Sequence, residues 1–180
     1  TSSGSRMASP EHQLCWVEAA LDQFEQPLLR YALRFVGCPE LAREVVQDTF
    51  LKLCQLDRST LTLGLGPWLY AVCRNQAIDT RRKESRMSTV IDPTTFEPSS
   101  NGHSPEQSAV ARDSGDWVLR QLNHLPEQQQ ECLRLKFQHG LKYGEIAAVI
   151  GTTANHVGVQ IHLGLKTLRE KLARFAENES

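Results

Sequence analysis

The chain has 180 residues, 40% hydrophobic side chains and a formal net charge of minus one, so it is long enough to bury one or two small cores. Aromatic residues make up 7% of it, and it has 11 Gly and 8 Pro, a balance that disfavours collagen-like, low-complexity and wholly disordered chains and favours helices. A net charge near zero counts against a nucleic-acid binder unless positive charge is concentrated in one segment. No apolar run approaches the ~20 residues of a membrane span and no secretory signal precedes the fold, so a cytoplasmic protein is expected.

The first six residues, 1–6, resemble an expression-tag remnant, and Met7 is the expected natural start. The five cysteines form no C-x-x-C pair, which opposes a disulfide framework or zinc site and predicts reduced, mostly buried thiols. The histidines are scattered along the chain. We therefore expect no metal and no cofactor.

The apolar spacing in the first half of the chain predicts four helices. Residues 11–36 are expected to form two of them, separated at Pro27, because proline cannot sit inside a regular helix. A third begins at Pro39 and ends near Leu56, and residues 57–67 read as a loop. The fourth runs from Trp68 to about Lys83, where the helix dipole alone would explain a basic C-terminal cluster.

Residues 87–115 are rich in Ser, Thr, Pro, Asn and Gly and carry four acidic residues against one basic residue, which predicts a flexible acidic linker. Four further helices are expected at 117–124, 126–138, 143–150 and 153–175. The predicted fold class is all-α, with two small helical domains joined by this linker. The second domain is a four-helix module.

The last two predicted helices have the layout of a helix-turn-helix, with an ordinary helical hairpin as the alternative. Gly151 makes the tight turn, Thr152 or Thr153 caps the next helix, and Ile146, Ala147 and Ile150 face inward. An apolar stripe of Val157, Ile161, Leu165, Leu168 and Leu172 faces the core. Residues 120–174 carry eight basic against four acidic side chains, which favours DNA binding.

The N-terminal turn of such a helix enters the major groove of DNA. The expected base-reading residues are Thr153, Asn155, His156 and Gln160, and the expected phosphate contacts are Lys142, Lys166, Arg169 and Lys171. Val159 and Leu163 also fall on the outward face. Two alternatives are open: Val159 contacts a thymine methyl group, or Val159 and Leu163 form part of a protein-partner surface. Gly158 and Gly164 lie inside the helix, and glycine there permits close backbone approach at a cost of roughly 1 kcal/mol each.

Three segments together resemble a known family, in order and in spacing: Leu41-A-R-E-V-V-Q-D-T-F-L-K-L53, Pro67-W-L-Y-A-V-C-R-N-Q-A-I-D-T-R-R-K83 and Leu125 through Gly151. The pattern is similar to that of bacterial sigma factors of the extracytoplasmic-function (ECF) type, group 4, which contain only regions 2 and 4. The resemblance implies a region 2 domain at 10–86, a region 4 domain at 116–176 and a non-enzymatic subunit. Such a subunit directs RNA polymerase to promoters and aids promoter melting.

The resemblance also implies binding residues. Those expected to contact the β′ clamp helices of core RNA polymerase are Arg43, Glu44, Gln47, Asp48 and Lys52. Those expected at the −10 element are Ser59, Thr60, Arg74, Asn75, Asp79, Arg81, Arg82 and Lys83, with Trp68 and Tyr70 as candidates for base stacking and Trp68 equally as a core anchor. The helix-turn-helix residues would read the −35 element as duplex DNA.

Further partners implied by the resemblance are the polymerase β flap and an anti-sigma factor, with nucleoid association when the protein is active. Two alternatives remain. A stand-alone helix-turn-helix regulator would bind a duplex operator without polymerase, usually as a dimer, but the motifs around Gln47-Asp48 and 68–83 count against it. A hydrolase using a Cys-His pair is supported only by scattered Cys and His residues.

Overall fold

The computed structural model of the chain describes residues 10–91 and 113–178. Seven α-helices and one short 3₁₀ helix, η1 (Arg58–Thr60), occur in the described residues, with no strand among them. They divide into two compact units, one holding α1 to α3 and the other α4 to α7. The all-α fold with two helical domains is therefore confirmed. The tag-like residues 1–6 lie outside the described residues, as does most of the predicted acidic linker.

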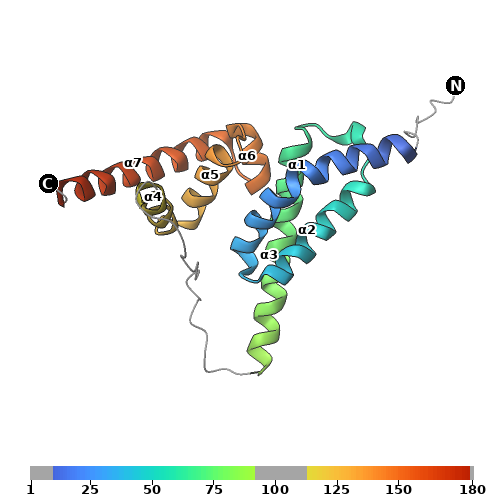
Figure 1. Cartoon of the computed structure of the whole chain (residues 1–180), viewed down its shortest axis with the longest axis horizontal. Helices are drawn as coiled ribbons and strands as arrows, with labels where there is room; N and C mark the ends of the chain where they lie inside the picture. The colour runs from blue at the N-terminus through green and yellow to red at the C-terminus, as the bar shows by residue number, and fades with distance from the viewer. Residues whose placement is uncertain (1–9, 92–112, 179–180) are drawn as a thin grey trace. The chain divides into compact units, whose positions relative to one another are not determined.

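The first unit consists of three helices that all pack against one another: α1 (Pro10–Val36), α2 (Pro39–Cys54) and α3 (Leu65–Ile91) (Figure 1). Each contributes fully buried side chains to one core, including Leu28 from α1, Leu53 from α2 and Leu69 from α3. The short turn at 37–38 brings α2 back along α1, so the polar sides of both helices remain exposed to solvent.

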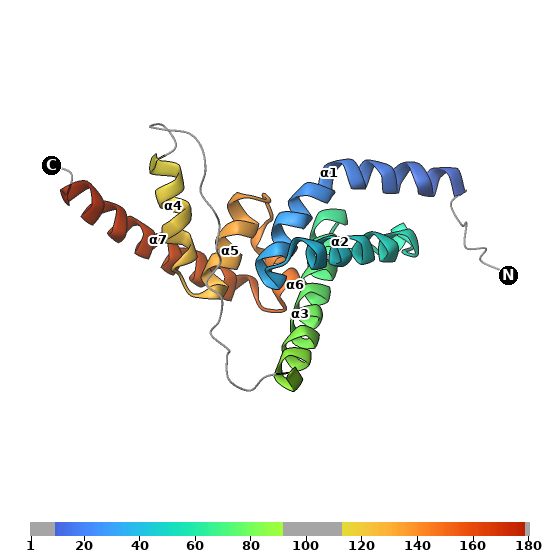
Figure 2. The same cartoon turned by 60° about the horizontal axis from the view of Figure 1, so that its bottom comes forward.

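A single helix, α1, replaces the two helices predicted on either side of Pro27. Proline removes one backbone N–H and bends a helix without always ending it, and α1 changes direction along its length (Figures 1 and 2). Residues on both sides of Pro27 are buried, Ala20 before it and Leu28 and Tyr31 after it. Burial of both halves on one core favours continuity over a break.

The helix α3 is longer than predicted at both ends, because it begins at Leu65 and ends at Ile91 instead of near Lys83. No Gly or Pro occurs between residues 84 and 91, so nothing in that stretch terminates the helix. Its last turn contains no basic residue. Interaction with the helix dipole therefore does not account for the basic cluster at 81–83, which was its simplest explanation.

The second unit contains α4 (Asp113–Asn123), α5 (Glu127–Phe137), α6 (Tyr143–Ile150) and α7 (Ala154–Asn178), and confirms the predicted four-helix module. Each of the three shorter helices packs on α7, and α5 also packs on α6 (Figure 2). Two differences from the predicted packing occur. Val149 is more deeply buried than Ile150, and the apolar stripe of α7 does not stay covered, since Leu172 is 48% exposed. With 25 residues, α7 is much longer than the 11-residue helices beneath it.

Gly164 of α7 lies at a tight contact within this unit. A Cβ placed there would lie 2.8 Å from Leu133 Cδ1 and 3.5 Å from both Gln129 Cβ and Leu125 Cδ1. Leu133 and Leu125 are buried, so they have little room to move. Glycine at 164 therefore serves the contact between α7 and α5, inside the protein.

The prediction of mostly buried cysteines is wrong: Cys73 and Cys132 are buried, Cys38 is half-buried, and Cys15 and Cys54 are exposed. Burial raises the pKa of the Cys73 thiol to about 12 and that of the Cys132 thiol to about 11. Among the described helices, none combines the length and apolar character needed to cross a membrane.

Candidate functional site

The turn between α6 and α7 is fixed by a few backbone contacts. Gly151 adopts a left-handed conformation (φ 74°), and its N–H and that of Thr152 both donate to the Ala147 carbonyl at 2.9 Å. The Thr153 hydroxyl oxygen then accepts a hydrogen bond from the His156 N–H at 3.2 Å, which caps the start of α7. Buried Ile146, Ala147 and Val157 hold the two helices together, so the helix-turn-helix geometry predicted from the sequence is present.

The first two turns of α7 present the predicted base-reading side chains to solvent. Thr153, Asn155 and His156 are exposed and Gln160 is half-buried. The Gln160 side-chain nitrogen lies 3.3 Å from His156 Nε2, so these two residues form one polar pair. Helical spacing places Asn155 on a different flank, together with His162 and Lys166. The predicted phosphate contacts Lys142, Lys166 and Arg169 are all exposed.

A shallow hollow of about 430 Å³ lies beside these side chains. The sequence analysis did not predict it. Its lining includes Tyr143 at the start of α6 and Asn155, Gly158, Val159, His162 and Leu163 of α7. A Cβ at position 158 would lie 3.6 Å from the Tyr143 ring. The outward apolar positions of α7 were visible in the sequence, but the approach of Tyr143 depends on the α6–α7 turn.

The outer face of α2 carries the residues expected to bind polymerase. Five polar side chains on it are exposed: Arg43, Glu44, Gln47, Asp48 and Lys52. Leu51 lies on the same face by helical spacing and is 53% exposed. The sequence analysis did not single it out. The signal for it was its spacing, because Leu51 follows Asp48 by three residues and Gln47 by four. The face therefore has one exposed apolar residue near its C-terminal end, beside polar residues with charges of both signs.

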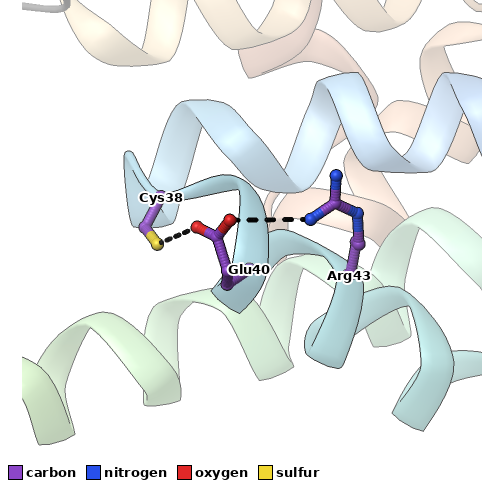
Figure 3. A network of polar contacts seen from close by, with 3 residues as sticks. All are labelled: Cys38, Glu40 and Arg43. Atoms are coloured by element: carbon purple, nitrogen blue, oxygen red, sulfur yellow. Dashed lines mark hydrogen bonds and ion pairs between the residues drawn. The ribbon is translucent and has the colours of Figure 1, made fainter.

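At the beginning of α2, Arg43 is already engaged in a small polar network (Figure 3). Its guanidinium lies 3.7 Å from Glu40 Oε1, while the Cys38 thiol donates to Glu40 Oε2 at 3.0 Å. The thiol hydrogen bond, helped by backbone and Arg43 contacts, lowers the pKa of Glu40. All of this is at the surface, so the ion pair orients Arg43 more than it stabilises the fold.

The predicted −10 residues on α3 occupy two adjacent flanks of the helix. Helical spacing groups Asn75, Asp79, Arg82 and Lys83, which are all exposed. Arg82 lies 3.8 Å from Asp79 Oδ1. Exposed Arg81 and half-buried Arg74 lie on the neighbouring flank. Three consecutive cations on the exposed part of α3 form a surface suited to phosphate groups.

The loop before α3 holds the remaining two predicted −10 residues, Ser59 and Thr60, both exposed in η1. The Ser59 N–H donates to Asp57 Oδ1 at 2.9 Å, which lowers the pKa of that carboxyl, and the Thr60 hydroxyl donates to the Asp57 carbonyl at 2.6 Å. The Arg58 guanidinium lies 5.6 Å from the centre of the Trp16 ring of α1. These contacts give the loop a defined conformation with its hydroxyl oxygens still able to accept hydrogen bonds.

The expectation that Tyr70 stacks on bases is wrong. Its side chain is only 2% exposed and packs edge to face against Tyr31, with ring centres 5.2 Å apart. Burial raises the pKa of its phenol. Trp68 is half-buried, as a residue anchoring the start of α3 would be.

Two family descriptions match the chain, one in each unit. Sigma-70 region 2 matches residues 21–87, and Sigma-70, region 4 matches residues 115–168. The first match contains the α2 face and the α3 cluster, and the second contains the helix-turn-helix.

Several curated relatives are similar along most of the chain. ECF RNA polymerase sigma factor SigD of Mycobacterium bovis is 31% identical over 161 residues, covering 84% of this chain and 74% of that protein. RNA polymerase sigma factor YlaC of Bacillus subtilis is 26% identical over 91% of this chain and 95% of its own length. ECF RNA polymerase sigma factor BldN of Streptomyces coelicolor is 27% identical over 84% of this chain, which spans only 58% of that relative.

A solved structure has the same fold. It is that of the sigma factor RpoE of Bartonella quintana, in complex with the anti-sigma factor NepR. The alignment covers 87% of this chain and 96% of the other, with a TM-score of 0.66 and 24% sequence identity. At that identity the similarity establishes the helical fold.

Proposed function

This chain belongs to the ECF family of RNA polymerase sigma factors, which act in promoter recognition and transcription initiation, and from this premise we propose how its two units divide that work. Residues 10–86 form the region 2 domain, which binds core polymerase and the −10 element. Residues 116–176 form the region 4 domain, which reads the −35 element. The chain is a group 4 member that works without enzymatic activity, in the cytoplasm and on the nucleoid when active.

The observation that carries this proposal is the start of α7. The Gly151 turn and the Thr153 cap hold a helix end whose exposed residues Asn155 and His156 can hydrogen-bond to base edges. Lys142, Lys166 and Arg169 lie exposed in the same unit and can neutralise backbone phosphates. A helix-turn-helix uses this arrangement to place side chains in the major groove of duplex DNA.

The first unit is suited to a different form of DNA. The exposed cluster Arg81, Arg82 and Lys83 supports contact with strand phosphates. The loop at Ser59 and Thr60, before the opposite end of α3, offers hydroxyl oxygens to an unstacked base. We infer that the first unit binds the backbone of the melting −10 element at one place and a base of it at the other.

Protein partners follow from the same assignment. The α2 face, with Leu51 beside Gln47 and Asp48, is the proposed contact with the β′ clamp helices, and region 4 is the proposed contact with the β flap. An exposed apolar residue among polar ones is typical of protein interfaces. The complex of Bartonella quintana RpoE with NepR supports an anti-sigma factor as a further partner.

The test is run-off transcription with core RNA polymerase on a promoter library randomised at both elements. We expect recovery of a −10 and a −35 motif, with −35 preference relaxed by about 1 to 3 kcal/mol for each lost bidentate contact in N155A, H156A or Q160A. K166A or R169A should weaken all −35 sequences alike. Absence of a polymerase complex, together with tight binding to a duplex operator, would contradict the proposal.

A further inference from the structure

The hollow beside the start of α7 is apolar where the rest of this helix face is polar. Val159 is 47% exposed, Leu163 is 42% exposed and Tyr143 is 41% exposed, and all three line it. Leaving three large apolar side chains in water is unfavourable, and a contiguous apolar surface of this kind commonly marks a contact site.

The residues around the hollow identify its occupant as DNA. Asn155 and His162 share the lining, and the amide of Asn is the side chain that pairs bidentately with the N6 and N7 atoms of adenine. Val159 follows Asn155 by one helical turn, so a base pair next to one read by Asn155 faces Val159. The apolar group that a base presents in the major groove is the 5-methyl of thymine.

The charges in this part of the second unit fit the same occupant. Lys142 directly precedes Tyr143 and Lys166 follows His162 by one turn, and both are exposed. Lys136 Nζ lies 5.4 Å from the centre of the Tyr143 ring. No carboxylate is among the lining residues, and Glu145 accepts a hydrogen bond from the Lys142 N–H at 2.7 Å. The lysines around the hollow can contact DNA phosphates, and the hollow itself can receive a methyl group of a base in the groove.

The Tyr143 ring packs against α7 at Gly158. A Cβ at that position would lie 3.6 Å from the ring, an ordinary contact distance, and Val159 lines the hollow beside it. Because Val159 lies one turn nearer the N-terminus of α7 than Leu163, it reaches further toward the base edges, about 6 Å along the axis. Tyr143 and Leu163 then form the walls.

We propose that Val159 is a specificity-determining residue that contacts the 5-methyl group of a thymine in the −35 element, with Tyr143 and Leu163 excluding water from that contact. The proposal rests on the assignment of α7 to the −35 duplex and adds the chemistry of one base. It predicts discrimination of thymine from uracil, which differ at this edge by the methyl group alone.

The experiment measures binding of the reconstituted holoenzyme to the −35 motif recovered from the promoter library. Each thymine of that motif is replaced singly by deoxyuridine. At one position we expect affinity to fall about fourfold, the effect of removing one methyl group from apolar contact. V159A should bind the thymine duplex about fourfold more weakly and show no further loss on deoxyuridine.

The matched control is L172A, which truncates a similarly exposed apolar residue of α7 far along the helix from the hollow and should keep the full thymine preference. The proposal is overturned if the motif contains no thymine, if deoxyuridine is tolerated everywhere, or if V159A retains the fourfold discrimination. The proposal is also overturned if V159A loses binding to a protein partner while deoxyuridine substitution has no effect. If scrambling of the −35 element does not change holoenzyme binding, the assignment of α7 to that element is wrong, and this failure is distinct from failure of the thymine contact.

Discussion

The two units of this sigma factor build their exposed surfaces in contrasting ways. The first consists of helices of 27, 16 and 27 residues, and its candidate binding residues lie along the middle of α2 and α3. The second has helices of 11, 11 and 8 residues that pack on a 25-residue α7, and its candidate base-reading residues gather at one helix end. The long polar faces of α2 and α3 suit extended partners, such as a protein helix or a melted DNA strand. The N-terminal end of α7, fixed by the turn before it, suits the groove of duplex DNA.

The charged residues are also distributed differently in the two units. Residues 14–86 carry ten basic and nine acidic side chains, while residues 120–174 carry eight and four. The first unit is nearly neutral, with three consecutive cations at 81–83 on α3, and the second has a general positive charge. A total of minus one therefore conceals two different charge distributions. With so few candidate phosphate contacts in each unit, the protein is expected to reach DNA mainly as part of the polymerase.

Each unit contains one buried cysteine, which allows the stability of the two cores to be compared directly. With pKa values of about 12 and 11 against an ordinary value of 9, Cys73 and Cys132 hold about a thousandfold and a hundredfold less thiolate than an unperturbed thiol. Mass-spectrometric labelling at neutral pH should therefore modify Cys15 and Cys54 first. Rapid labelling of Cys73 in the native protein would contradict the described core.

The same shifts set a pH dependence. A thiol whose pKa is raised by folding stabilises the folded state fully below its unfolded value of 9, and this contribution is lost as the pH rises from about 9 toward 12. Unfolding monitored by labelling in mild denaturant should thus become easier above pH 9 in both units. C73A should reduce this dependence in the first unit alone.

The next largest effect is expected from the α3 cations. The triple variant R81A/R82A/K83A should lower open-complex formation by between tenfold and hundredfold and flatten its salt dependence, because up to three phosphate contacts are lost. Binding to core polymerase should be unchanged. An equal loss in core binding would show that the cluster serves the polymerase instead of the promoter.

The exposed apolar residue of the α2 face, Leu51, gives a smaller, complementary change. L51A should weaken binding to core polymerase about tenfold, as truncation of an apolar anchor at an interface costs roughly 1 to 2 kcal/mol, with promoter preferences unchanged. L172A is the control, since Leu172 is similarly exposed but lies in the other unit. Wild-type affinity of L51A, measured by fluorescence titration, would exclude this face as the contact.

The two internal glycines of α7 provide the finest comparison. G158A should stabilise the second unit by up to about 1 kcal/mol, because alanine favours the helix and its Cβ meets the Tyr143 ring at an ordinary 3.6 Å. G164A should destabilise it by about 1 kcal/mol or more, because its Cβ would lie 2.8 Å from the buried Leu133. Hydrogen exchange of α7 amides measures both changes, and the same sign for both would contradict this packing.

Much of the fold was predictable where local chemistry decided it. The bounds of α6 agree with those predicted, because the Gly151 turn and the following threonine cap are local signals. The continuity of α1 through Pro27 was not predictable, since it depends on burial of Leu28 and Tyr31 against the other two helices. The exposure of Leu172 likewise depends on where the neighbouring helices end.

The candidate site was predictable to a similar extent. Helical spacing alone placed Asn155, Val159 and Lys166 outward. The Tyr143 wall of the hollow and the burial of Tyr70 required tertiary contacts that no local pattern encodes. The length of α3 was encoded in the absence of helix breakers before Pro93, a signal outweighed in the prediction by the polar composition of that stretch.

The most direct test of the central claim, that each unit reads its own promoter element, is run-off transcription that combines protein variants with scrambled elements. The α7 variant N155A/H156A/Q160A should reduce transcription from a promoter whose −10 element is scrambled. It should cause no further reduction when the −35 element is scrambled. The α3 variant R81A/R82A/K83A should show the reverse. Independent, additive effects of both variants with both elements would contradict the division of labour between the two units.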